Sequence, residues 1–230
     1  GKNRRALGVL ASNIENGKVI ENGYYEMSDT LALVRKDDTQ TADFIREKFA
    51  IPHQVVTIDE SSVLIVDDRQ RRWRLPLGDE NYTKLIGQDV VRICREVATE
   101  RDLFNCHGTF YELPAENADG YAKIRPIASH NFRINDYASY RGMLVMTGID
   151  PKKDKDNEHI IVSEDGKAAV WAGAIDDLWS MGKPTGKGGP WKNTLVMAGE
   201  VSDPYLIGFY DKKNLTLSHN SQKDVTFTIE

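Results

Sequence analysis

The chain has 230 residues, 40% of them apolar, and its 30 Lys and Arg residues against 35 Asp and Glu residues give a net charge of −5. This length allows one large domain or two small ones and is sufficient for a hydrophobic core. The negative charge gives no electrostatic case for nucleic acid as the main partner, and no apolar run reaches the roughly 18 residues that a membrane span needs.

The first element expected along the chain is a β-hairpin. Two short apolar runs, residues 7–11 and 18–20, flank Asn16-Gly17, a pair that tolerates the positive φ of tight hairpin turns. Further strands are expected at residues 31–34 and 54–57. Between them, residues 41–49 carry apolar side chains at helical spacing after Thr41, which predicts a short helix with Thr41 as its cap.

The pattern of strand, turn and strand occurs four more times. Its turn residues are Asp68, Asp119, Asp165 and Asp211, so that, counted from Asn16, successive turns lie 46 to 52 residues apart. Additional strands are expected at residues 90–93, 143–146 and 195–197, and one helical turn at residues 175–181 after an N-capping Asp.

This spacing is typical of the four-stranded blade of a β-propeller. We therefore expect an all-β fold, a single propeller domain of about five four-stranded blades over residues 1–230; a β-sandwich is the alternative. The chain begins with Gly1 and ends in an alternating strand pattern at residues 226–230. We expect it to be a piece of a longer protein.

Metal and cofactor sites are not expected. The two cysteines, Cys94 and Cys106, are too few for a zinc site or a disulfide scaffold, and free buried thiols are favoured over a bridge between them. No two of the five histidines stand at a metal-binding spacing, and neither a P-loop nor a dinucleotide fingerprint is present.

One hairpin carries a family resemblance. Residues 163–171 (SEDGKAAVW) resemble the Asp box of sialidase-like propellers, S-x-D-x-G-x-T-W, although Gly166 directly follows Asp165 and no Thr precedes Trp171. In that family the Asp and Gly form the turn and the Trp packs between blades. The box is structural there, so the resemblance concerns the fold.

Residues 106–114, 124–131, 140–142, 176–179 and 188–191 are similar to segments of secreted bacterial propeller proteins from glycan-utilisation systems. This resemblance implies a secreted or periplasmic location and a glycan or other small polar ligand. It does not fix a reaction.

The densest polar and aromatic segment lies between the third and fourth hairpins. In a sugar-binding loop its tyrosines would stack on sugar rings while Asn, Asp and Arg side chains bind hydroxyl groups. The alternative is a polar loop between blades whose tyrosines fill grooves. The segment contains His130, Asn131, Arg133, Asn135, Asp136, Tyr137, Tyr140 and Arg141.

A second cluster, Asp176, Asp177 and Trp179, combines two carboxylates with an aromatic ring. Glycoside hydrolysis uses two carboxyl groups that flank the scissile bond, whereas an Asp pair at this position could simply cap a helical turn. Two functions therefore remain open: a propeller that binds and hydrolyses a glycan, or a recognition module that binds a glycan or a protein without turnover. In the first, Asp136 and Asp176 or Asp177 act as acid and base, Arg133 and Arg141 position the substrate together with His130 and Asn131, and Tyr140 and Trp179 stack on it.

Overall fold

The computed structural model describes residues 6–16, 18–49, 56–67, 69–79, 92–95, 102–114, 118–134, 136–153 and 156–230. Their regular secondary structure is mostly β-strand with little helix, so the prediction of an all-β class is confirmed. Within the described ranges the strands form four antiparallel sheets, none of which closes into a barrel or a propeller.

The first sheet has the order β1-β2-β3, with strands Leu7–Glu15, Lys18–Met27 and Leu33–Lys36. Its β1–β2 hairpin is the first one predicted, and Asn16 takes the expected positive φ of 49°.

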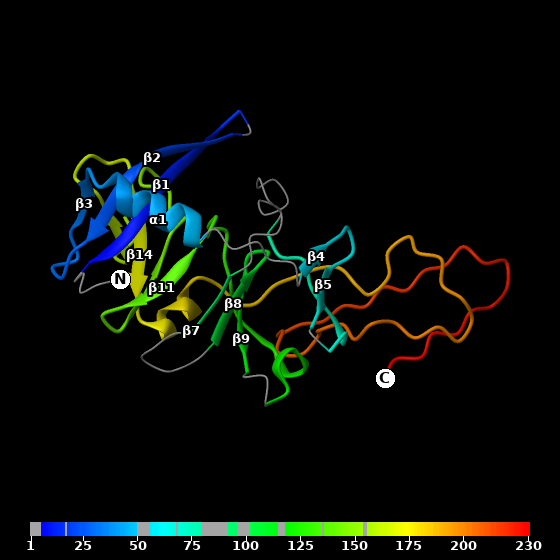
Figure 1. Cartoon of the computed structure of the whole chain (residues 1–230). Helices are drawn as coiled ribbons and strands as arrows, with labels where there is room; N and C mark the ends of the chain where they lie inside the picture. Colours follow the sequence, from blue (N-terminus) through cyan, green and yellow to red (C-terminus); the bar gives the residue numbers. More distant parts are fainter. Residues whose placement is uncertain are drawn as a thin grey trace.

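The short helix predicted at residues 41–49 is α1 (Thr39–Phe49), and it covers the first sheet (Figure 1). Gly8 of β1 permits the close approach, because a Cβ atom there would lie 2.8 Å from Ile45 Cδ1 of the helix. The expected cap is wrong: Asp38, rather than Thr41, supplies the capping oxygen and accepts a hydrogen bond from the Thr41 backbone N–H at 2.9 Å.

The second sheet is a three-stranded meander, β4-β5-β6, and contains the second predicted hairpin. Its strands are Val56–Ile58, Val63–Val66 and Arg72–Leu75.

The third sheet has four strands in chain order, β7 to β10, and contains the third predicted hairpin. The strands are Arg92–Arg95, Asp102–Cys106, Thr109–Leu113 and Arg125–Ser129, and the 3₁₀ helix η3 (Gly120–Lys123) precedes the last of them.

The fourth sheet departs from a simple meander, because β14 lies between β12 and β13. Its strands are β11 (Tyr137–Tyr140), β12 (Met143–Met146), β13 (Ile160–Val162) and β14 (Ala169–Gly173). The fourth predicted hairpin is the β13–β14 pair. The 3₁₀ helix η4 (Ile175–Ser180) follows at the expected helical turn.

The segment that resembles an Asp box forms the β13–β14 turn. Ser163 Oγ donates a hydrogen bond to Asp165 Oδ1 at 2.7 Å and accepts one from the Ala168 backbone N–H at 3.0 Å. Tyr25 of the first sheet donates to Asp165 Oδ2 at 3.0 Å, and Trp171 is buried between the third and fourth sheets. The segment is therefore structural.

Three hydrophobic clusters join the sheets in series. One joins the second and third sheets through Val63 and Phe104, and another joins the third and fourth through Leu103 and Trp171. The last joins the fourth and first sheets and includes Tyr25. Neighbouring residues of β8, Leu103 and Phe104, point to opposite faces, so the third sheet is buried on both sides. The sheets thus stack in the order second, third, fourth, first (Figure 1).

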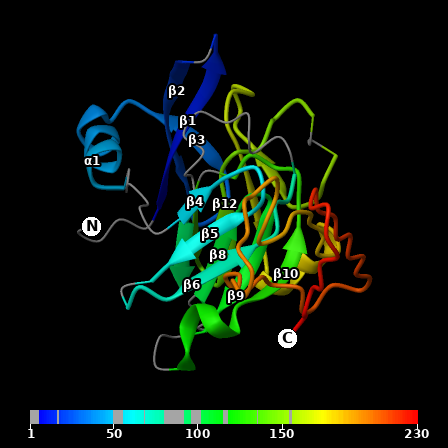
Figure 2. The same ribbon diagram turned by 90° about the vertical axis from the view of Figure 1, so that its right-hand side faces the viewer.

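The fifth predicted hairpin is wrong. Residues 206–209 and 215–217 form no strand, nor does the run expected at 195–197. Residues 182–230 instead pass the second sheet without joining it as a strand (Figure 2). They make isolated backbone bridges between Arg74 and Tyr205 and between Leu77 and Lys187. Ile207 and Leu215 remain 55% and 67% exposed, and a hairpin with no surface to bury its apolar face is only marginally stable.

Candidate functional site

The turn η4 carries two exposed residues of the predicted site, Asp176 and Trp179. Its apolar residues Ile175 and Leu178 are buried in the cluster that joins the third and fourth sheets, while Asp176 and Trp179 point outward. Trp179 is 67% exposed. Because the buried residues fix one side of the short helix, the indole is presented to solvent on the other.

Hydrogen bonds on both sides hold η4 in place. Asp177 Oδ2 accepts a bond from the Ala174 backbone N–H at 2.7 Å, and Ser180 Oγ donates to the Asp177 carbonyl at 2.6 Å. Asp177 thus caps the turn from its third position, whereas the expectation of an N-capping Asp is wrong, because Ala174 is the N-cap residue. On the other side, the Ser129 backbone N–H of β10 donates to the Gly182 carbonyl at 3.2 Å, which ties the turn to the third sheet.

His159 and Asp177 both approach Gly173, and no motif in the sequence predicts this. A Cβ atom on Gly173 would lie 2.8 Å from His159 Nδ1 and 2.9 Å from Asp177 Oδ2, so both atoms converge where Gly173 lacks a side chain. His159 Nδ1 donates to the Ala172 carbonyl at 3.2 Å, and its ring packs on Trp171. The Asp165-Gly166 turn could have placed His159 near this strand. It sets the β13–β14 register, which puts residue 159 opposite residue 172.

His130, predicted to contact substrate, is placed inside the protein with only 6% of its surface exposed. Its Nε2 donates to Asn105 Oδ1 at 2.8 Å, and its ring packs between Phe110 and Phe132. Burial lowers the pKa of His130 to about 4, although a hydrogen bond at Phe132 and the charge of Asp79 act in the opposite direction.

This burial predicts a pH-dependent stability. The unfolded chain takes up a proton near pH 6.5 and the folded one only near pH 4, so the stabilisation is complete above about pH 6.5 and falls as the pH drops towards 4. We expect the loss to approach about 3 kcal/mol for this group. Urea unfolding at several pH values checks it: His130→Gln should be less pH-dependent than the wild type in this range, whereas the exposed control His219→Gln should not differ from it.

The rest of the predicted polar segment divides into two groups. Asn131 and Arg133 are exposed next to buried Ile134, which belongs to the same hydrophobic cluster as η4. Asp136 Oδ1 accepts a bond from the Tyr137 backbone N–H at 2.8 Å, and the Tyr137 hydroxyl donates to the Leu103 carbonyl at 2.7 Å. Tyr137 therefore fills the core, as the alternative expects. Asn135 lies outside the described residues.

Tyr140 and Arg141 lie at the far end of β11. Arg141 takes a φ of 51° in the β11–β12 turn, lies over the Tyr140 ring, and places a guanidinium nitrogen 3.7 Å from Asp29 Oδ2. Tyr140 packs on the cluster between the fourth and first sheets. A four-residue strand spans about 13 Å, so these two residues belong to a different region from Asp136.

A charged cleft of about 510 Å³ lies between α1, β2 and β3. It was not predicted, because its lining comes from three elements that carry no motif. Arg46 binds both carboxylate oxygens of Glu21, at 2.8 and 2.6 Å, and also pairs with Asp43. Among the described residues that line it, Tyr24 is the one aromatic residue, and it is buried. This described lining therefore offers charge without an exposed ring.

Chemistry at Cys106 is disfavoured by its surroundings. Cys106 is a free, buried thiol, and burial raises its pKa far above the ordinary value, so the nucleophilic thiolate is not populated at neutral pH. Among the described residues, no group of three or more His, Cys, Asp and Glu side chains could hold a metal ion. In the same residues, no helix combines the length and apolar character that crossing a membrane requires.

Comparisons with known proteins do not assign this chain to a family: no family model, curated protein or solved structure matches it.

Proposed function

We propose that the protein binds a glycan, with a sugar ring stacked on Trp179, in a secreted or periplasmic location. The observation that carries this proposal is the exposed indole on a turn whose other side is packed and hydrogen-bonded. The backbone that carries the ring is already ordered before a ligand arrives, so little backbone entropy is lost on binding.

The surroundings of Trp179 suit a polar ring with hydroxyl groups. Exposed Asp176 offers carboxylate oxygens as hydrogen-bond acceptors. Asn131 and Arg133 follow β10, the strand whose Ser129 is bonded to Gly182, two residues after η4. Hydrolysis by Asp136 with Asp176 or Asp177 is the stronger form of the proposal. The convergence of His159 Nδ1 and Asp177 Oδ2 at Gly173 favours it, because it places a second titratable group beside this carboxylate.

For the fold, we propose that the four sheets are blades of a β-propeller. Neighbouring sheets pack face to face as blades do, and three of the four have their strands in chain order. The first and second sheets lie at opposite ends of the stack (Figure 1). To complete a ring, these two ends would have to meet directly or through further strands.

Replacing Trp179 by alanine should weaken glycan binding at least tenfold, because a central aromatic contact often contributes more than about 1.4 kcal/mol. A panel of oligosaccharides screened by calorimetry identifies a ligand for the wild type, and the variant is then titrated with it. Phe44→Ala, which removes an exposed ring from α1, is the matched control and should bind normally.

Equal glycan affinity of the wild type and Trp179→Ala would refute the proposal that a sugar ring stacks on Trp179. Aryl glycosides test the stronger form: turnover by the wild type that disappears in Asp136→Asn and Asp177→Asn supports hydrolysis. Glycan binding by a wild type that turns over no aryl glycoside would favour the alternative, a recognition module without catalysis.

A further inference from the structure

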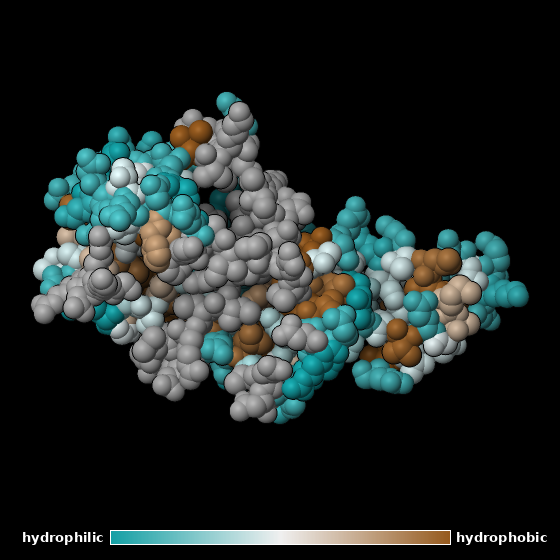
Figure 3. Space-filling view, in the orientation of Figure 1, coloured by the Kyte–Doolittle hydropathy of each residue, from teal (hydrophilic) through white to brown (hydrophobic). Residues whose placement is uncertain are grey.

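Residues 192–230, here called the arm, expose an unusual amount of apolar side chain. The arm leaves the second sheet and projects away from the sheet stack (Figure 1), and brown patches mark its surface in Figure 3. Its exposed apolar residues are Leu195, Val196, Met197, Val201, Ile207, Phe209, Leu215, Leu217, Val225, Phe227 and Ile229.

Most of these side chains recur at every second position. Leu215 and Leu217 form one such pair, and residues 225, 227 and 229 form a triplet. In an extended chain, side chains two residues apart point to the same face. The arm therefore has the pattern of strands with one apolar face, yet it contains no strand.

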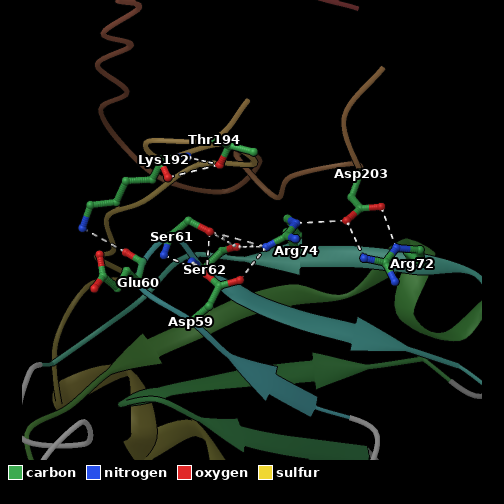
Figure 4. A network of polar contacts seen from close by, with 9 residues as sticks. All are labelled: Asp59, Glu60, Ser61, Ser62, Arg72, Arg74, Lys192, Thr194 and Asp203. Carbon is green, nitrogen blue, oxygen red and sulfur yellow. Dashed lines mark hydrogen bonds and ion pairs between the residues drawn. The ribbon is translucent and has the colours of Figure 1, made fainter. Parts of the chain in front are cut away.

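The base of the arm is fixed to the second sheet. The Arg74 backbone N–H donates to the Pro204 carbonyl at 2.8 Å, and the Leu206 N–H donates to the Arg74 carbonyl at 2.9 Å. Asp203 accepts bonds from Arg72 at 2.9 Å and from Arg74 at 3.0 Å, while Lys192 Nζ donates to the Glu60 carbonyl at 3.1 Å (Figure 4). The arm thus starts from a fixed position on the second sheet, where its backbone is hydrogen-bonded to the edge strand β6.

We propose that the arm pairs with the arm of a second copy of this chain, so that each completes the strands of the other in a two-fold symmetric dimer. The arm contains four lysines and five acidic residues, a net charge of 4 − 5 = −1. Two such arms repel each other little, and near-neutral charge does not select a strongly charged partner.

The exposed area is sufficient for a stable dimer. Eleven largely exposed apolar side chains amount to on the order of 1,000 Å² per copy, and a standard interface needs about 800 Å² per partner. A two-fold axis buries the same patch on both copies, so one self-complementary sequence is enough.

Sedimentation equilibrium of the full chain tests this proposal. We expect a mass of twice 25.9 kDa at about 10 to 100 µM, and at least a tenfold weaker dimer for Leu215→Glu/Phe227→Glu. Because both side chains are exposed in the single copy, this variant should fold normally, which circular dichroism checks.

Phe44→Glu places one such charge on an exposed apolar site outside the arm and should remain dimeric. A wild type that stays monomeric throughout this range would overturn the proposal. So would a dimer that the arm variant leaves intact, or one that Phe44→Glu disrupts equally. Glycan binding at Trp179 is measured independently, so neither result decides the other.

Discussion

Replacing Arg74 by methionine is expected to lower the free energy of unfolding by about 2–4 kcal/mol. The Arg74 side chain is only 14% exposed and holds Asp203 at 3.0 Å, Asp59 at 3.2 Å and Ser62 Oγ at 2.7 Å. Methionine keeps the apolar stem but leaves the carboxylates of Asp59 and Asp203 without this cation. Removing one partner of a buried or partly buried ion pair is costly for this reason.

Arg72→Met is the matched control for this change. Arg72 also binds Asp203, at 2.9 Å, but its side chain is 47% exposed, so we expect a loss below about 1 kcal/mol. Urea unfolding measures both variants, and equal losses would contradict the importance assigned to Arg74.

The effect of Arg74→Met should also depend on pH. Burial raises the pKa of Asp59, but hydrogen bonds from Ser61, Ser62 and Arg74 outweigh it and lower this pKa to about 2; hydrogen bonds from Arg72 and Arg74 lower that of Asp203. Carboxylates with a lowered pKa stabilise the fold above their ordinary value near 3.8, and this stabilisation is lost as the pH falls towards 2. The difference between the wild type and Arg74→Met should therefore shrink over this acid range.

Gly148→Ala should destabilise the protein by at least about 3 kcal/mol. Gly148 has a φ of +85°, and a Cβ atom there would lie 1.8 Å from the Arg133 carbonyl oxygen. The left-handed backbone costs an L-residue about 1 kcal/mol, and the clash can be relieved only if the backbone of the 133–134 segment moves. Thermal unfolding measures the loss.

Gly142→Ala separates the cost of the left-handed backbone from the cost of the steric clash. Gly142 has a φ of +77° but has no atom within 4 Å of an added Cβ, so only the backbone term of about 1 kcal/mol applies. A similar loss in both variants would show that the segment at Arg133 yields easily. A much larger loss of stability for Gly148→Ala would show that the close approach of Gly148 to the Arg133 carbonyl holds the backbone at Arg133 in place.

The sequence predicts hairpins well wherever a turn residue and a covered face coincide. Asn16, with its positive φ, and the Asp165-Gly166 turn mark two of the four confirmed hairpins. The hairpin expected around Asp211 has the same alternation, but its apolar side chains Ile207, Phe209, Leu215 and Leu217 are 48% to 67% exposed. Alternation records which side chains share a face and carries no information on whether another element lies against it.

The candidate site is predicted unevenly for a related reason. Trp179 and its capped turn follow from local pattern, because neighbouring residues form the turn. His130 lies among polar residues in the sequence but is buried by Phe110, from another strand. His159 and Asp177 both approach Gly173 only because of the hairpin register and the missing side chain of that glycine. Such long-range packing is not encoded in any short segment.

The stacking order of the sheets also affects how the chain acquires its structure during synthesis. The first sheet is covered by the fourth, and the hydrogen bond from Tyr25 to Asp165 joins residues 140 positions apart. At about 5 to 20 residues per second, roughly 7 to 28 s separate the synthesis of these two residues. Until then the side chains of the first sheet that face the fourth have nothing to pack against. The first sheet to be made is therefore among the last to become stable, and it is the part of the nascent chain most exposed to misassembly.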